Sequence, residues 1–227
     1  MTESFDLEEK HIEIFTGKST SNGLPLVLLN TFADEAKCVW QKCKEIECPP
    51  FTLACISGMD WNADLSPWDI PPLRKNDRPF SGKADSYLKF LTEKALPAIS
   101  QKLPAPQAYT VLAGYSLAGL FALYAPHKTK IFPRIVAASP SAWFPRFVDF
   151  VKNTPFATKP DRIYLSLGDS ESKTKNPLLS TVQANAEILE AFYTSQKIKS
   201  IFDLNNGNHF TENELRIAKG IKWVLGE

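Results

Sequence analysis

The stretch Val111-Leu-Ala-Gly-Tyr-Ser-Leu-Ala-Gly-Leu-Phe121 decides the fold of this chain. Strand-forming residues from Tyr109 to Ala113 lead to Ser116, and an apolar segment typical of a buried helix, 117–125, follows at once. Such a turn needs very small side chains around the serine, because the two backbones approach closely. The chain supplies three of them: Gly114, Ala118 and Gly119. The stretch predicts a nucleophile elbow that exposes Ser116 above a sheet; the alternative is a tight turn with an inert serine.

The composition is that of a globular chain that can bury one large core. Of the 227 residues, 44% are hydrophobic and 22% are charged, so we expect a single domain, 1–227. The 26 basic residues balance 25 acidic ones and are scattered, which argues against a nucleic-acid partner. The acidic N-terminus lacks the order of a secretory signal, and no apolar run reaches membrane-spanning length. These features predict a cytoplasmic protein without a membrane partner.

The cysteines do not indicate a metal or redox site. Their spacing matches neither a zinc pattern nor C-x-x-C, and no histidine lies near them in the sequence: Cys38, Cys43, Cys48 and Cys55. We expect reduced, structural thiols and no metal ligands.

Strand patterns alternate with helical ones along the chain. Strands are expected at 11–15, 23–29, 51–56, 109–113, 132–138, 161–167 and 200–204. Helices are expected at 34–47, 82–102, 117–125, 178–196 and after 211, where Thr211 and Glu214 suggest a capping box. This alternation predicts an α/β fold with a mostly parallel central sheet flanked by helices on both faces.

The segment from Met59 to Gly82 has no convincing periodicity. It is rich in proline and carries two tryptophans and a basic cluster: Trp61, Trp68, Arg74, Lys75 and Arg78. It leaves the carboxyl end of a strand, where open α/β sheets keep their ligand crevices, so we expect a pocket wall or lid. The alternative is a surface excursion that the tryptophans hold in place. Trp143 and Phe144 follow the strand at 132–138 and are expected beside Ser116, as pocket walls or as core filler.

A serine nucleophile needs a base, and three histidines are available. His11 precedes the core strands and His127 lies a few turns beyond Ser116. His209 follows the last strand in a Gly/Asn loop, so it can reach the carboxyl edge of the sheet and is the predicted base.

The base in turn needs a carboxylate to orient it, and two candidates follow the strand at 161–167. Glu171 is preferred because it stands three residues after Gly168, the place where many such enzymes carry their acid. Asp169 could instead hold the turn, and Asp203 is a weaker rival. The order serine, acid, histidine is that of the α/β-hydrolases. The oxyanion hole is expected from the backbone N–H of Leu117 and from that of Thr31 or Phe32.

Five motifs resemble the serine esterase branch of the α/β-hydrolase superfamily, which includes enterochelin (siderophore) esterases and S-formylglutathione hydrolase. They are Asn62-Ala-Asp-Leu-Ser-Pro67, Gly114-Tyr-Ser-Leu-Ala-Gly119, Ser139-Pro-Ser-Ala-Trp143, Gly168-Asp-Ser-Glu171 and Asn206-Gly-Asn-His209. The resemblance runs from about Leu24 to the C-terminus. It implies an α/β-hydrolase fold and a Ser116, Glu171, His209 triad with no metal or organic cofactor. Ala118 stands where family members often have a second glycine, and the short region before Leu24 implies a truncated sheet or a homodimer that completes it.

Together these features predict a cytoplasmic esterase that cleaves a small-molecule carboxylic ester through an acyl-enzyme on Ser116. The expected pocket residues are Trp61, Trp68, Trp143 and Phe144, with Arg74, Lys75 or Arg78 for an anionic substrate. Acyl transfer and thioester hydrolysis use the same triad and stay open. So does a non-catalytic binding module that keeps the hydrolase fold.

Overall fold

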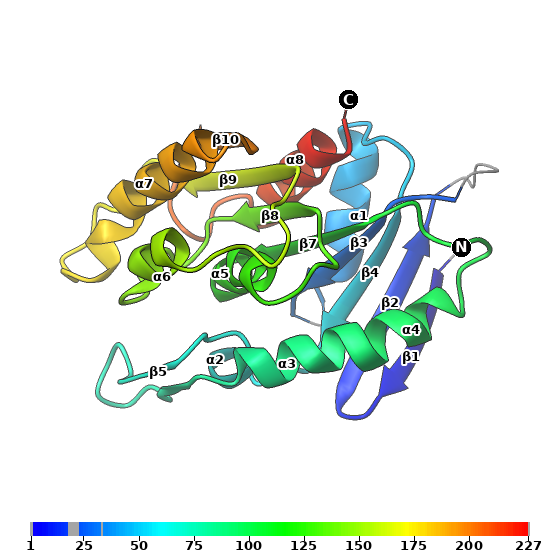
Figure 1. Ribbon diagram of the computed structural model, residues 1–227, viewed down its shortest axis with the longest axis horizontal. Coiled ribbons are helices and arrows are strands. Elements are labelled where there is room, and N and C mark those ends of the chain that lie inside the picture. The colour runs from blue at the N-terminus through cyan, green and yellow to red at the C-terminus, as the bar shows by residue number, and fades with distance from the viewer. Residues whose placement is uncertain (1, 18–22, 33, 227) are drawn as a thin grey trace.

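The computed structural model describes residues 2–17, 23–32 and 34–226. Within that part, eight strands form one sheet of order β1-β2-β4-β3-β7-β8-β9-β10 (Figure 1). They are β1 (Thr2–Leu7), β2 (Lys10–Thr16), β3 (Leu26–Asn30), β4 (Thr52–Ser57), β7 (Thr110–Tyr115), β8 (Arg134–Ala138), β9 (Arg162–Gly168) and β10 (Lys199–Asn205). All neighbours from β4 to β10 pair in parallel, whereas β2 is antiparallel to β1 and β4. The predicted α/β fold with a mostly parallel sheet is confirmed.

The N-terminal edge of the sheet corrects one expectation. The residues before Leu24 supply two strands, so this edge of the sheet is not truncated; the homodimer stays a prediction. β1 was not predicted because its segment is acidic. Its alternation nevertheless packs Phe5 and Leu7 against the core while Ser4 and Asp6 lie exposed.

Helices cover both faces of the sheet, because successive strand residues point to opposite sides. In β3, Val27 and Leu29 pack toward α1 (Ala36–Glu45) and α8 (Asn213–Leu225). Leu26 and Leu28 belong to the core of the other face. That face carries α3 (Ala84–Phe90), α4 (Leu96–Ser100), α5 (Leu117–Tyr124), α6 (Phe147–Asn153) and α7 (Val182–Ser195). Two separate apolar cores therefore sandwich the sheet.

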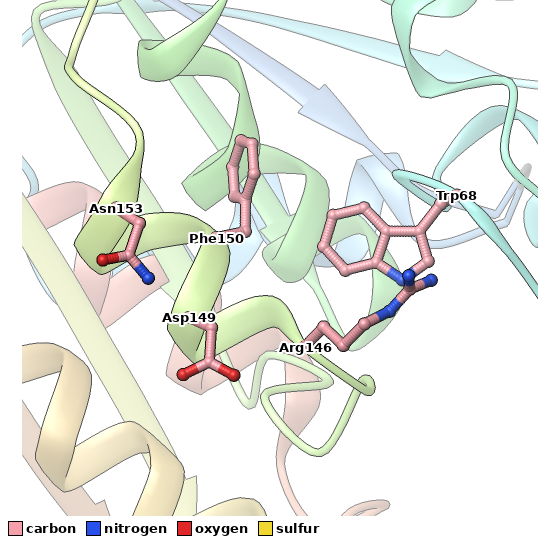
Figure 2. A pocket seen from close by; sticks show the side chains of 5 residues that line it. All are labelled: Trp68, Arg146, Asp149, Phe150 and Asn153. Carbon is pink, nitrogen blue, oxygen red and sulfur yellow. The ribbon is translucent and has the colours of Figure 1, made fainter.

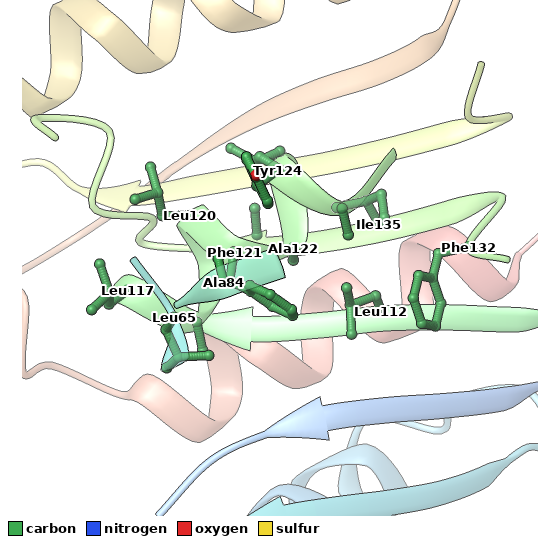
Figure 3. Packing of buried hydrophobic residues seen from close by; sticks show 14 of the residues in the cluster. Leu65, Ala84, Leu112, Leu117, Leu120, Phe121, Ala122, Tyr124, Phe132 and Ile135 are labelled. Carbon is green, nitrogen blue, oxygen red and sulfur yellow. The ribbon is translucent and has the colours of Figure 1, made fainter. Parts of the chain in front are cut away.

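Helix α5 lies at the centre of the larger core. All eight of its residues are buried, as expected for a helix that is apolar on every side. Figure 3 shows part of this packing, with Leu112 and Ile135 of the sheet close to the α5 side chains. The ring of Phe121 also meets that of Tyr87 from α3, with 5.4 Å between the ring centroids. The helix that follows Ser116 is thus held from both sides.

Several expected elements differ in detail. The predicted helix at 82–102 consists of α3, a π-helical turn (Leu91–Ala95) and α4, and the helix at 178–196 begins with a 3-10 turn (Leu179–Thr181) before α7. The segment 59–82 contains α2 (Trp61–Asp64) and a short antiparallel pair, β5 (Asp69–Ile70) with β6 (Phe80–Ser81). Helix α6 was not predicted. No helix in the described ranges is long and apolar enough to cross a membrane.

The capping box predicted at the last helix is wrong. The residue before α8 is Glu212, in a left-handed conformation with φ 52°, and it makes no side-chain cap. The Thr211 hydroxyl instead accepts a hydrogen bond from the Asn208 N–H at 3.1 Å. Thr211 is therefore engaged in the loop that carries His209 rather than in starting the helix.

Candidate active site

Ser116 occupies the sharp turn between β7 and α5. Its φ of 57° and ψ of −121° lie in a region that residues other than glycine rarely adopt, and the surrounding structure must hold it there. The Ser116 N–H donates to the Ala138 carbonyl at 3.1 Å, and the Ser116 carbonyl accepts from Leu120 at 3.1 Å and from Ser141 at 3.0 Å. These bonds tie the turn to β8 and to the first turn of α5.

Gly114 makes this turn sterically feasible. A Cβ atom at this position would lie 2.3 Å from the carbonyl carbon of Ala118, so strand and helix can approach only without a side chain. We expect Gly114→Ala to lower the free energy of unfolding by about 1–3 kcal/mol through overpacking. Urea unfolding followed by circular dichroism measures this loss. Gly226→Ala is the matched control, because its nearest added contact is an ordinary 3.5 Å, and equal stability of the two variants would contradict the prediction.

His209 and Glu171 reach Ser116 from the ends of two other strands. The Ser116 Oγ lies 3.0 Å from His209 Nε2, and His209 Nδ1 lies 2.7 Å from Glu171 Oε2. Glu171 follows β9, and His209 follows β10. Since the carboxyl ends of parallel strands meet at one edge of a sheet, residues far apart in the sequence form one continuous hydrogen-bonded chain.

Glu171 is a buried carboxylate with several donors. Its side chain is 4% exposed, and its second oxygen, Oε1, accepts from the Gly168 N–H at 2.6 Å, the Ser139 hydroxyl at 2.8 Å and Arg216 Nη1 at 2.9 Å. Burial alone raises the pKa of Glu171, but the hydrogen bonds from His209 and Gly168 outweigh it, so the pKa lies below its ordinary value. The carboxylate is therefore ionised at neutral pH.

The rival carboxylates have other partners. Asp169 accepts from the Gly207 N–H at 3.1 Å, which fixes the loop before His209. Asp203 accepts from the hydroxyl of Tyr164 at 2.6 Å. Neither is hydrogen-bonded to His209, whose carboxylate partner is Glu171.

The two other histidines lie away from Ser116. His11 sits on β2 and pairs with Asp6 at 2.6 Å. His127 Nδ1 donates to the main-chain carbonyls of Thr154, at 2.9 Å, and Pro155, at 3.4 Å. Its ring stacks on that of Phe156. Burial lowers the pKa of His127, in keeping with a neutral side chain of the interior.

The amides expected to hold an oxyanion differ in availability. The Leu117 N–H begins α5, and no acceptor for it occurs among the residues that the structure describes. The Thr31 N–H donates to the Ile56 carbonyl at 3.0 Å, which removes it as a candidate. The Phe32 N–H makes only a long contact of 3.3 Å with Glu35 Oε2. Of the two alternatives after β3, Phe32 is the one with an amide that could turn to a ligand.

A pocket of about 300 Å³ opens on Ser116. Besides Ser116, His209 and Glu171, it is lined by Leu73, Arg74, Pro140, Ser141, Trp143, Leu179, Val182 and Phe210. Most of this wall is apolar, and among the described lining residues Arg74 carries the positive charge. Phe210 is 84% exposed and stands at the mouth, with its ring edge-on to that of His209.

Trp143 and Arg74 thus line the pocket as expected, but three predicted wall residues do not. Phe144 is 1% exposed and belongs to the core. Trp68 donates to the Pro145 carbonyl at 3.2 Å and lines a separate shallow depression with Arg146 and Phe150, shown in Figure 2. Trp61 stacks on Phe32 at 4.2 Å and faces another surface hollow. These rings fill space between the 59–82 segment and its neighbours.

Sequence reasoning missed Arg216, which is 1% exposed and contacts Glu171 from α8. An arginine between Leu215 and Ile217, one turn before Gly220, was the available signal. It also missed Ser139, whose hydroxyl bonds Glu171, and Ser141, whose Oγ lies 3.5 Å from that of Ser116.

The cysteines lie apart from this site and form no disulfide in the described ranges. Cys55 is buried in β4, and burial raises the pKa of its thiol well above the ordinary value. No group of three or more His, Cys, Asp or Glu side chains within the described part of the chain could hold a metal ion.

Comparisons with known proteins place this site in context. Residues 34–212 match the family described as "Putative esterase". No curated protein sequence matches the chain significantly.

Solved structures share the fold at low sequence identity. The siderophore hydrolase EstA from Aspergillus nidulans is 19% identical, with a TM-score of 0.72 over 99% of this chain and 93% of its own. The BES protein from Bacillus cereus is 18% identical, with a TM-score of 0.79 over 100% and 96%. The enterobactin esterase FES from Shigella flexneri is 20% identical, with a TM-score of 0.76 over 99% of this chain and 58% of its own. At such identities these likenesses establish the fold alone.

Proposed function

Since the chain belongs to this esterase family, we propose that it hydrolyses small-molecule carboxylic esters through an acyl-enzyme on Ser116. The observation that carries the proposal is the hydrogen-bonded chain from Ser116 Oγ through His209 to Glu171. A serine hydroxyl is a weak nucleophile until a base takes its proton. In this row of hydrogen bonds His209 is the base and Glu171 the carboxylate that orients it.

In the first half of the proposed reaction, His209 Nε2 takes the proton of Ser116 as Oγ attacks the ester carbonyl. A bond forms between Oγ and the carbonyl carbon, and the carbonyl oxygen becomes an oxyanion. The N–H groups of Leu117 and Phe32 are the donors proposed for that charge. Glu171 stabilises the imidazolium that forms, since it is ionised and bonded to Nδ1.

The second half regenerates the enzyme. The tetrahedral intermediate collapses, His209 gives its proton to the leaving alkoxide, and the acyl group stays on Ser116. His209 then takes a proton from water, whose oxygen attacks the acyl carbon. Collapse of the second intermediate returns this proton to Ser116 Oγ and releases the acid.

The pocket supports an ester with an apolar or aryl group. Trp143 and Leu73 offer apolar walls, and Arg74 places a positive charge where an anionic substituent could bind. Two of the similar structures are named a siderophore hydrolase and an enterobactin esterase. Because Leu73 and Arg74 come from the 59–82 segment, we propose this segment as a pocket wall.

A serine-directed fluorophosphonate tests the nucleophile without knowledge of the substrate. We expect intact-mass analysis and peptide mapping to find one phosphonyl adduct, on Ser116. His209→Ala should slow labelling by about 100-fold or more, since the base is lost. His11→Ala is the matched control and should label like the native protein, because His11 lies on β2. Absence of the adduct, or equal labelling of both histidine variants, would refute the proposed activation.

A further inference from the structure

Arg216 is a fully buried cation that contacts Glu171 and is not among the residues that line the pocket. Its Nη1 lies 2.9 Å from Glu171 Oε1, 3.0 Å from Ser139 Oγ and 3.2 Å from the Tyr115 hydroxyl. Its Nη2 donates to the carbonyls of Asn206 and Asn208, each at 3.1 Å. One guanidinium therefore meets all three segments that carry the proposed triad.

Besides Glu171 itself, two of these contacts involve residues that directly precede a member of the proposed triad. Tyr115 precedes Ser116 and donates its hydroxyl to the His209 carbonyl at 2.8 Å. Asn208 precedes His209, and Asn206 begins the same loop. The planar fork of an arginine can hold a carboxylate and two carbonyls at fixed angles, which a lysine ammonium cannot do. Because the Arg216 guanidinium holds the backbone on the N-terminal side of His209, it also determines where the His209 ring lies.

The packing around the guanidinium leaves little room for another arrangement. A Cβ atom on Gly168 would lie 2.8 Å from Arg216 Nη2 and 2.2 Å from the Gly207 carbonyl oxygen. The turn that carries Glu171 and the loop that carries His209 therefore close tightly on this side chain. A buried ion pair is in general a weak source of stability, so its placement against Glu171 points to a role in the chemistry.

Glu171 divides its two oxygens between His209 and Arg216. Oε2 faces His209 at 2.7 Å, and Oε1 faces Arg216 at 2.9 Å. Arginine stays protonated at every pH that the enzyme meets, so its charge always offsets part of the Glu171 charge. Among the described residues, three other charged or titratable groups share a contact, the loop or the pocket lining with His209: Tyr115 from β7, Asp169 from the turn after β9 and Arg74 from the 59–82 segment. Glu212 lies three residues further along the chain, before α8.

We propose that Arg216 is a positioning residue of the reaction, which fixes the His209 loop and limits how strongly Glu171 favours protonated His209. The inference rests on the proposed function, since both effects act through His209. The Arg216 side chain contributes in two ways: the planar shape of the guanidinium holds the loop, and its charge acts on Glu171. Two substitutions distinguish them.

Arg216→Lys keeps the charge and loses the fork. We expect kcat for p-nitrophenyl acetate to fall about 10-fold or more, with little change in KM, because the loop that carries His209 is held less firmly. The acidic limb of the kcat/KM profile should stay where it is in the native enzyme, since a positive charge still faces Glu171. A native kcat in this variant would overturn the positioning role.

Arg216→Met loses the charge as well. Without the neighbouring positive charge, the full charge of Glu171 stabilises the imidazolium. His209 is then protonated more easily, so the acidic limb of the kcat/KM profile should move about one unit to higher pH. Arg134→Met is the matched control, because Arg134 also reaches α8, through the Val224 carbonyl at 2.6 Å, but lies outside the site. Its limb and kcat should match the native enzyme.

Folding and the proposed function are checked separately. Circular dichroism and thermal melting show which variants are folded, and if Arg216→Met fails to fold, Arg216→Lys still decides the positioning role. A folded Arg216→Met with an unmoved acidic limb would overturn the electrostatic role. Native enzyme that neither turns over the ester nor labels at Ser116 would instead overturn the proposed function, and this inference with it.

Discussion

Replacing Ser116 by alanine is expected to reduce kcat/KM for p-nitrophenyl acetate by about 10⁴-fold or more, with the fold unchanged. In the proposed mechanism the Ser116 Oγ forms the acyl-enzyme. The neighbouring hydroxyl, that of Ser141, lies 3.5 Å from Ser116 Oγ and is not the one that faces His209, so it cannot take over this role. Alanine has no more difficulty than serine with a φ of 57°, so the turn should persist.

The measurement is steady-state hydrolysis together with thermal melting of the same samples. Ser195→Ala is the matched control, since Ser195 ends α7 and its hydroxyl donates to the Phe192 carbonyl of the same helix, at 2.7 Å. Activity of Ser116→Ala close to that of the control, in a folded protein, would show that another group is the nucleophile.

The three triad candidates that the sequence predicted all lie beyond strand ends. Ser116, Glu171 and His209 each follow a strand that is recognisable from its apolar run, and parallel pairing brings the ends of such strands to one edge. The pattern around Ser116 was also recognisable from the sequence, because the close approach of the backbones leaves little room for larger side chains at Gly114 and Gly119. Local chemistry and one topological rule were sufficient here.

The parts that were missed depend on packing between distant segments. Whether Phe144 lines the pocket or fills the core is decided by α6, which the sequence did not reveal, and by Trp68, whose ring meets that of Phe144 at 5.7 Å. Arg216 looks like one more charge on an amphipathic helix until α8 is placed behind the Glu171 turn. Thr31 was weighed as an amide donor, yet its N–H is committed to the Ile56 carbonyl. Such outcomes depend on three-dimensional neighbours.

Replacing Glu171 by glutamine is expected to lower kcat by about 10⁴-fold, the loss seen when the carboxylate of such a triad becomes an amide. The amide is neutral and cannot offset the imidazolium charge, and its N–H₂ group can hold His209 in the wrong tautomer. Asp169→Asn is the matched control. The Asp169 contact with the Gly207 N–H needs only a carbonyl oxygen, so its activity should stay within about 10-fold of the native enzyme. A reversed ranking of the two variants would make Asp169 the acid.

The same substitution has a consequence for stability that depends on pH. Glu171→Gln leaves the buried Arg216 without its anion, at a cost of about 3–5 kcal/mol at neutral pH. The pKa of Glu171 is lower in the folded protein than its ordinary value, so ionisation stabilises the native fold above the ordinary pKa, about 4.3. That contribution is lost as the pH falls through the lowered folded pKa. The difference in unfolding free energy between the native and Glu171→Gln proteins, measured by urea titration from pH 7 to pH 3, should therefore shrink at the acidic end. A difference that stays constant over this range would mean that Glu171 is not the ionised partner of Arg216.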